Sequence, residues 1–272
     1  MNRPVRLGAV DYLNVRPLVY GLDRWPDLVS VRFDAPSECA RLLEAGEIDL
    51  GMVPSITYLN RPGDRIVPGL CIGSDGPVDS VALFLRTPLA EVRTLAVDTS
   101  SRTSVALTRI LCARRFGISP AFVPHAPDLG AMLAVADGAL IIGDPALFAD
   151  HRAIGAEKVD LGQAWTEMTG LPFVWAFWAG RPDAASPQVI ALLQDAADAG
   201  EKHLDAIADA HIEDPARRAI GRRYLNDNLM FRLSGRALDG LRTYYREALA
   251  IGAASGDPSL AFFDADASVG SR

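Results

Sequence analysis

Cysteine and histidine are scarce in this chain of 272 residues, which contains three cysteines and four histidines. Cys39, Cys71 and Cys112 are odd in number, far apart, and each set in an apolar stretch. This pattern predicts buried thiols and argues against a disulfide framework. The histidines, at positions 125, 151, 203 and 211, show no ligand spacing such as His-x-x-x-His. We therefore expect no metal site.

The chain also lacks a long apolar run and a cluster of basic residues. No stretch approaches the about 18 consecutive apolar residues of a membrane span, and Met1 to Leu7 lead into a strand-like run without a signal-type segment. We expect a soluble, cytoplasmic protein with no membrane partner. The net charge of −7 argues against nucleic acid as a partner. A small anionic ligand stays compatible, because the local field of a site need not follow the net charge.

The chain has enough apolar sequence for a large core, since 49% of its residues are hydrophobic. Its length allows one large domain or two smaller ones. In the first third, strand-like runs alternate with a helix that opens at Pro36 and ends before Gly46. Strand, helix and strand at this pitch predict β-α-β units and a mostly parallel sheet. The strands predicted for this unit are 5–10, 29–33, 48–53, 66–72 and 80–86.

A second α/β series begins after Thr87-Pro88, and the chain ends in a long helical segment. The second series comprises strands 93–97, 121–124 and 139–142, helices 103–116 and 128–136, a short helix from 145, and an apolar aromatic strand at 173–178. The later helices are predicted at 187–203, 215–225 and 234–252. We expect two α/β lobes with a ligand cleft between them. The first lobe would be discontinuous, 1–86 plus 179–272, and the second, 87–178, would be inserted.

The stretch from Val97 to Leu107 is the most informative part of the sequence. An apolar strand gives way to a dense hydroxyl cluster, and apolar residues then recur at helical spacing. Ser101, Thr103 and Ser104 can cap this helix, but one cap needs fewer hydroxyls than are present. The free N–H groups and the positive dipole end of the helix make an anion site for a carboxylate or phosphate. The alternative is a Ser/Thr-rich cap without a ligand.

Four further polar residues stand at predicted strand ends, where ligands of two-lobed proteins bind. Asn14 either caps a helix or holds a hydroxyl or carboxylate of a ligand. Ser55 caps the next helix or contacts the ligand, and Ser80 opens an apolar strand, which favours ligand contact. Asp144 either caps the helix beginning at Pro145 or serves as a general acid.

Arginines and tryptophans near these motifs have two interpretations each. Arg16 and Arg102 either pair with a ligand carboxylate or are simply exposed. Among Trp165, Trp175 and Trp178, one is expected to wall the cleft and the others to lie in the core.

Several motifs together resemble the MqnA family, the chorismate dehydratases of the futalosine route to menaquinone. They are Gly8-x-x-x-Tyr12-Leu13-Asn14-x-x-Pro17-Leu18, Leu43-x-x-Gly46-x-Ile48-Asp49-x-x-x-Val53-Pro54-Ser55, Ser101-Arg102-Thr103-Ser104 and Gly143-Asp144-Pro145. The resemblance runs from about residue 5 to 250. It implies a type II periplasmic-binding-protein-like fold in a cytoplasmic hydro-lyase. The implied reaction converts chorismate to 3-[(1-carboxyvinyl)oxy]benzoate and water, with no cofactor.

Under this resemblance, the catalytic candidates are Asn14, Ser80 and Asp144, and the substrate-binding candidates are Ser55, Ser101, Thr103 and Ser104. Two other functions stay open. One is the related enzyme that acts on a cyclic futalosine product, for which His125 is a candidate residue. The other is a non-catalytic protein that binds or senses a small anion. The sequence does not determine the oligomeric state, and a homodimer is one option.

Overall fold

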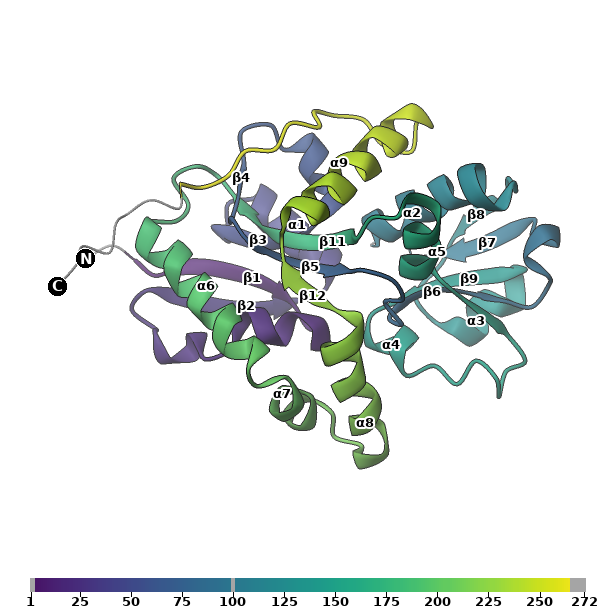
Figure 1. Ribbon diagram of the computed structural model, residues 1–272, viewed down its shortest axis with the longest axis horizontal. Helices are drawn as coiled ribbons and strands as arrows, with labels where there is room; N and C mark the ends of the chain where they lie inside the picture. Colours follow the sequence, from purple (N-terminus) through teal and green to yellow (C-terminus); the bar gives the residue numbers. More distant parts are fainter. Residues whose placement is uncertain (1–2, 99–100, 265–272) are drawn as a thin grey trace.

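The computed structural model describes residues 3–98 and 101–264, and the chain folds around two β-sheets (Figure 1). The first sheet has the order β12-β5-β11-β3-β1-β2, with β4 paired to β11. Its strands are β1 Val5–Val10, β2 Val29–Asp34, β3 Leu50–Pro54, β4 Arg65–Ile66, β5 Leu70–Ser74, β11 Phe173–Gly180 and β12 Met230–Arg232. The second sheet has the order β10-β6-β9-β7-β8. Its strands are β6 Val81–Leu85, β7 Thr94–Val97, β8 Ala121–Pro124, β9 Gly138–Ile142 and β10 Glu157–Asp160.

Each sheet has a parallel half and an antiparallel half. β1 pairs in parallel with β2 and β3, and β7 pairs in parallel with β8 and β9. The strands β11 and β6 run antiparallel to their neighbours β3 and β9. The expectation of mostly parallel sheets therefore holds only for the β-α-β halves. β6 and β11, each the first strand after a crossing between the sheets, run opposite to the parallel strands of the sheet that they join.

The predicted lobe boundaries at 86/87 and 178/179 need correction. β6 belongs to the second sheet and β11 to the first, so the chain crosses between Ser74 and Val81 and returns before Phe173. Both strands are short, almost fully buried apolar runs. Such a run has no polar face that would indicate which sheet it joins. We use "first lobe" for the first sheet with its helices, and "second lobe" for the second sheet with the helices of 102–169.

The helices follow the expected pattern, with two additions, α5 and α7. They are α1 Pro36–Glu44, α2 Arg102–Leu111, α3 Leu129–Val135, α4 Asp144–Leu147, α5 Leu161–Thr169, α6 Pro187–Glu201, α7 Leu204–His211, α8 Pro215–Arg223 and α9 Gly235–Ala250. Capping explains where several begin: Asp128, Ser186 and Ser234 each accept a hydrogen bond from an amide of the first turn. α2 and α8 continue into single π-helical turns, η5 Cys112–Phe116 and η6 Tyr224–Asn228. In the described residues, no helix is long and apolar enough to cross a membrane.

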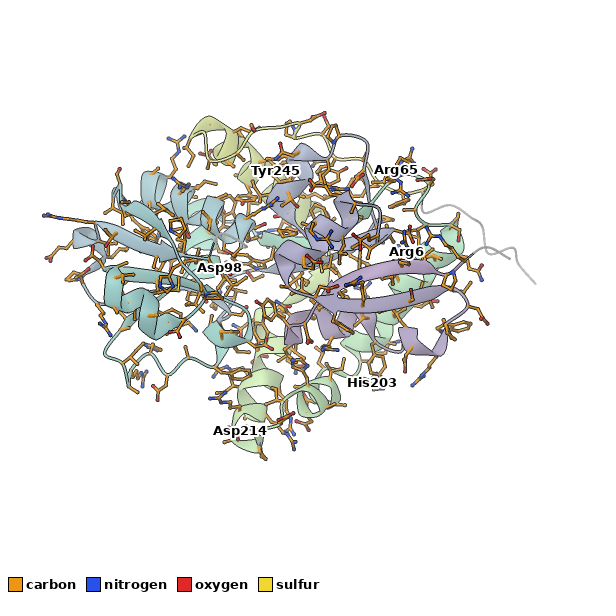
Figure 2. All side chains as sticks on the ribbon, turned by 180° about the vertical axis from the view of Figure 1, so that it is seen from behind. Arg6, Arg65, Asp98, His203, Asp214 and Tyr245 are labelled. Carbon is orange, nitrogen blue, oxygen red and sulfur yellow. The ribbon has the colours of Figure 1, made fainter. Side chains whose placement is uncertain are left out.

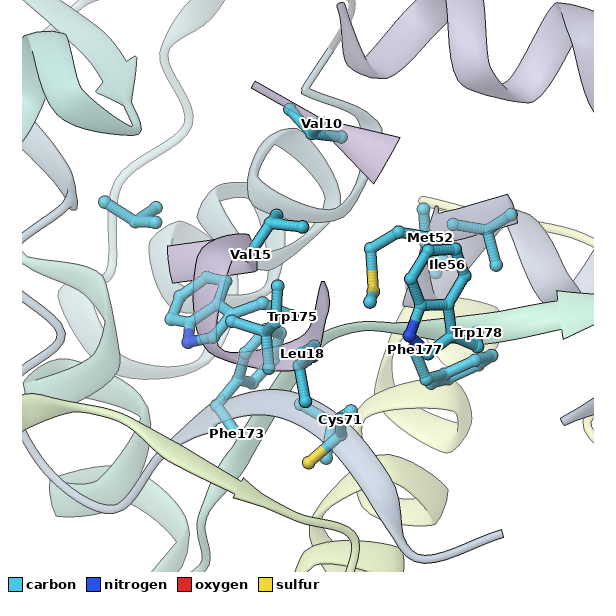
Figure 3. Close-up of a cluster of buried hydrophobic side chains, with 14 of the residues drawn as sticks. Val10, Val15, Leu18, Met52, Ile56, Cys71, Phe173, Trp175, Phe177 and Trp178 are labelled. Atoms are coloured by element: carbon cyan, nitrogen blue, oxygen red, sulfur yellow. The ribbon is translucent and has the colours of Figure 1, made fainter. Parts of the chain in front are cut away.

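The core of the first lobe packs against both faces of its sheet. Figure 3 shows Met52, Cys71, Phe177 and Trp178 among these buried side chains. The three cysteines are buried and free, which confirms the expectation of core thiols. Burial raises the pKa of Cys39 to about 11, so this thiol stays protonated at neutral pH.

One glycine sets how closely α6 approaches the short 3-10 helix η1 (Leu13–Val19), which carries Asn14. A Cβ added at Gly200 would lie 2.0 Å from the carbonyl oxygen of Pro17. Alanine normally stabilises a helix interior by about 1 kcal/mol over glycine. Here the contact is with backbone, so we expect overpacking of about 3 kcal/mol to outweigh that gain.

Gly200→Ala is therefore expected to lower the free energy of unfolding by about 2 kcal/mol, measured by urea denaturation. Gly235→Ala in α9 is the matched control, since nothing lies within 4 Å of its added Cβ. Equal or greater stability of Gly200→Ala would contradict the close approach of α6 to η1.

Candidate functional site

A pocket lies between the two sheets, where strands of both lobes end and α2 begins. The empty space there, including open solvent at the mouth, is about 650 Å³. In the first lobe the walls come from β1, η1, β3, β5 and β11, and in the second lobe from β6, β9 and α2. Residues 75–80, which lead from the first lobe to the second and are called the crossing segment below, complete them. The lining residues are Val10, Tyr12, Asn14, Val15, Met52, Pro54, Ile72, Val78, Ser80, Val81, Ser101, Thr103, Ser104, Ile142, Gly143, Trp175 and Ala176.

The start of α2 brings three predicted hydroxyls to the pocket wall. Ser101 is the N-cap residue but makes no capping hydrogen bond with its side chain. The Ser104 hydroxyl has no hydrogen-bond partner among the residues that the structure describes, although both serines are about 95% buried. Thr103 Oγ1 accepts a hydrogen bond of 3.3 Å from the Ile56 amide of the first lobe, and no described residue accepts its own proton. These hydroxyls and the amides of the first helical turn are donors of the kind that bind an anion.

The predicted cluster extends further than the structure can describe. Thr99 and Ser100, which belong to the same hydroxyl-rich stretch, lie outside the described residues. Asp98, just before them, lies where the two lobes meet (Figure 2). Burial, together with the charges of Asp98 and Asp144, raises the pKa of Tyr12 above its usual range.

Asn14 and Ser80 both line the pocket, and Ser80 contacts a tyrosine that the sequence did not indicate. Ser80 Oγ lies 2.7 Å from the Tyr224 hydroxyl. Tyr224 stands directly after two arginines, in the helix predicted at 215–225. Its side chain is nonetheless buried. Only one feature of the sequence indicated that this face of the helix is buried, namely that Tyr224 is aromatic and follows Gly221 by about one helical turn.

Ser55 does not reach the pocket wall. Its hydroxyl donates a 2.8 Å hydrogen bond to the Val174 carbonyl, and its own carbonyl accepts one of 2.6 Å from Tyr245, which Figure 2 labels. The side chain is fully buried. Ser55 therefore ties the 3-10 helix η3 (Ser55–Asn60) to β11 and α9, instead of contacting a ligand as we had expected.

Asp144 joins the two lobes beside the pocket instead of lining it. Its carboxylate accepts a hydrogen bond of 3.2 Å from the Leu13 amide, and His211 Nε2 lies 3.1 Å from its other oxygen. The residue before it, Gly143, has φ of +68° and would place a Cβ 2.7 Å from the Tyr12 ring. Glycine is thus required at position 143 for this close contact with Tyr12. The Asp144 carboxylate is engaged in holding the lobes together. This placement argues against the general-acid role considered from the sequence.

The remaining candidates lie away from the pocket wall. Asp11 and Arg16 form an ion pair, and the Arg16 guanidinium lies 4.1 Å from the centre of the Phe33 ring. His125 is exposed, with Nδ1 2.7 Å from the Ala126 carbonyl oxygen. Arg102 is exposed as well. No charged side chain lines the pocket in the described part of the chain.

Trp175 is the tryptophan that walls the pocket. Its indole N–H donates to Ser74 Oγ at 3.2 Å, and its ring packs 4.3 Å from that of Phe173, measured between centroids. Trp165 and Trp178 are fully buried in the core. The pocket thus combines an aromatic wall with hydroxyl and amide donors. Over residues 3–98 and 101–264, no group of three or more His, Cys, Asp or Glu side chains is arranged to hold a metal ion.

Comparison with known proteins identifies two kinds of relative. A family model described as menaquinone biosynthesis matches residues 5–250. The chain is 32% identical over 225 residues to the chorismate dehydratase of Thermus thermophilus, covering 76% of this chain and 82% of that protein. It is 28% identical over 175 residues to the chorismate dehydratase of Campylobacter jejuni, covering 62% and 64% of the two chains.

Solved structures with similar folds include proteins of more distant sequence. A protein from Archaeoglobus fulgidus superposes with a TM-score of 0.72 at 17% identity, over 92% of this chain and 98% of that one. The periplasmic aliphatic sulphonate binding protein of Escherichia coli gives a TM-score of 0.64 at 16% identity, over 93% and 94%. These likenesses confirm the expected fold class, the two α/β lobes of periplasmic-binding-protein-like structures.

Proposed function

The chain belongs to the menaquinone-biosynthesis family, and from this premise we propose that it is a chorismate dehydratase. It is a hydro-lyase that converts chorismate to 3-[(1-carboxyvinyl)oxy]benzoate and water. The observation that carries the assignment to this pocket is the start of α2, where the Ser101 and Ser104 hydroxyls, which have no hydrogen-bond partner among the described residues, line an aromatic-walled cavity. A carboxylate needs such donors, and a planar ring fits the wall formed by Trp175.

The chemistry of chorismate explains why these donors matter. The proton on ring C3 is γ to the ring carboxylate through a double bond, so its removal builds negative charge that spreads onto the carboxylate. Donors fixed at the start of α2 would stabilise that charge without reorganising. The C4–oxygen bond then breaks, the hydroxide takes a proton and leaves as water, and the ring becomes aromatic.

We propose that the base is the enolpyruvyl carboxylate of the substrate. This carboxylate is tethered close to C3, and well-oriented intramolecular groups reach effective molarities of about 10⁵ M or more. The walls of the pocket support the proposal, since the described lining residues include no carboxylate and no histidine. Asn14 and Ser80 would hold the enolpyruvyl side chain and the leaving hydroxyl.

Replacing any one of the ionisable groups near the pocket should accordingly lower turnover only modestly. We expect Asp144→Asn, Asp11→Asn and His125→Gln each to retain kcat within about tenfold of the wild type. The reason is that each alters a group placed outside the pocket wall. Circular dichroism checks that each variant folds. A loss of about 10⁴-fold in one folded variant that still binds chorismate would identify a side-chain base instead.

The proposed function is tested by incubating the purified chain with chorismate and following the aromatic product by absorbance and mass. We expect loss of one water per chorismate, with no added metal or cofactor. Binding of chorismate without turnover would instead indicate a solute-binding role, and turnover of a cyclic futalosine would indicate the related enzyme. A cytoplasmic location is proposed from the biosynthetic role of the family.

A further inference from the structure

One polar side chain of the pocket meets a buried hydroxyl that does not itself line the cavity. Tyr224 is 1% exposed, and its hydroxyl lies 2.7 Å from Ser80 Oγ of the crossing segment. Tyr224 begins η6 of the first lobe, whereas Ser80 directly precedes β6 of the second. The tyrosine therefore links the first lobe to a proposed catalytic side chain.

The π-helical turn η6, which begins at Tyr224, is attached along the crossing segment. At its far end Asn228 donates a 2.9 Å hydrogen bond to the Pro77 carbonyl, and just before it Arg223 lies 3.4 Å from the Asp79 carboxylate. Together with the contact between Tyr224 and Ser80, three contacts thus join this turn and the residue before it to residues 77–80. π-Turns of this kind often occur where a helix serves a functional site.

The backbone that presents Ser80 is fixed from the other side. Asp79 has φ of +61°, a conformation that is rare outside glycine. The Asp160 carboxylate accepts hydrogen bonds from the amides of Val78 and Asp79, at 3.1 and 2.6 Å. The backbone of Ser80 is therefore held by the second lobe, and its hydroxyl by Tyr224.

We propose that Tyr224 is a positioning residue of the dehydratase, whose hydroxyl fixes the Ser80 hydroxyl at the pocket wall. The proposal rests on the proposed function and adds a residue to it. A serine hydroxyl has one proton and two lone pairs, so Ser80 can engage Tyr224 and the substrate at once. The part of the Ser80 hydroxyl that is not engaged by Tyr224 is then directed at the substrate.

Tyr224 acts through its neighbours and does not exchange a proton with the substrate. Burial raises the pKa of its hydroxyl far above the usual range, despite the hydrogen bond with Ser80. The hydroxyl therefore stays protonated at every working pH. Its loss should misplace the Ser80 hydroxyl, which acts during the reaction, while the carboxylate-binding donors of α2 are untouched. The effect should accordingly appear in kcat and not in KM.

The test compares Tyr224→Phe with Tyr58→Phe in steady-state turnover of chorismate. Tyr58 is a matched control because it is equally buried and donates its hydroxyl proton to the Asp64 carbonyl at 2.7 Å, away from the pocket. We expect Tyr224→Phe to lower kcat about 10- to 100-fold, because the Ser80 hydroxyl would lose its buried hydrogen-bond partner. KM should stay within about threefold of the wild-type value. Tyr58→Phe should leave both constants near those of the wild type.

A double variant separates positioning from a general loss of structure. If Tyr224 acts through Ser80, Ser80→Ala combined with Tyr224→Phe should lose much less than the product of the two single losses. Asn228→Ala loosens the same turn from its far end, and should lower kcat severalfold even if Tyr224→Phe does not fold. Wild-type kcat in folded Tyr224→Phe, or multiplicative losses in the double variant, would overturn the inference. Absence of turnover by the wild type would overturn the proposed function itself.

Discussion

Replacing Asn14 with aspartate is expected to lower kcat/KM for chorismate by about 10³-fold at neutral pH. Asn14 lines a pocket whose described walls carry no charge, and the substrate brings two carboxylates. A third carboxylate about 4 Å away would repel one of them by about 4 kcal/mol at an effective dielectric constant near 20. Asn14→Ala, which removes the amide without adding charge, should lose about 10²–10³-fold, mainly in kcat.

The pH dependence of Asn14→Asp gives a second signature. A carboxyl in an apolar pocket beside a dianion should have a raised pKa, because both burial and like charge disfavour its ionised form. As the pH falls through that pKa, the side chain becomes neutral and regains the shape of asparagine. The deficit relative to wild type should therefore shrink at lower pH, measured as the ratio of kcat/KM values between pH 5 and 8. Wild-type activity of Asn14→Asp at neutral pH would place Asn14 outside the substrate site.

The double variant Ser101→Ala with Ser104→Ala is expected to raise KM for chorismate by at least about 10²-fold. Each hydroxyl would donate a charge-assisted hydrogen bond to a carboxylate, worth about 1.5–3 kcal/mol. Neither hydroxyl makes a hydrogen bond within the described part of the chain, so their removal leaves no protein group there without its partner. The measurement is steady-state KM, together with the dissociation constant of the benzoate product.

Thr108→Val is the control on the same helix. The Thr108 hydroxyl is fully buried and donates to the Ser104 carbonyl at 2.8 Å, so it faces the helix backbone and not the pocket. It should change stability and leave KM unaltered. Thr103→Ser, which keeps a hydroxyl at the third position, should also stay near wild type. An unchanged KM in the double variant would remove the start of α2 from the carboxylate site.

Local chemistry explains why much of the fold could be predicted from the sequence. Apolar runs indicated most of the strands, and Pro36 indicated where α1 begins. The hydroxyl cluster at 101–104 indicated a helix start after a strand, and the structure places it on the pocket wall. Each of these signals lies within a few residues of the feature that it predicts.

The features that the sequence did not reveal depend on contacts between distant segments. β6 and β11 are both apolar runs, and only their pairing partners decide which sheet each one joins. Tyr224 reaches Ser80 across 144 positions of sequence. Asp144 is bound by Leu13 and His211, and Ser55 by Val174, so their hydrogen bonds exist only once the lobes are packed. A local pattern cannot encode such pairs.

The most direct test of this account is a crystal structure of the chain with 3-[(1-carboxyvinyl)oxy]benzoate bound. We predict that the ring carboxylate lies about 2.7–3.2 Å from donors of residues 101–104. The ring should pack against Trp175, and the enolpyruvyl carboxylate should face Asn14 and Ser80. Product bound in another groove of the molecule, with the pocket between the sheets left without it, would contradict the account.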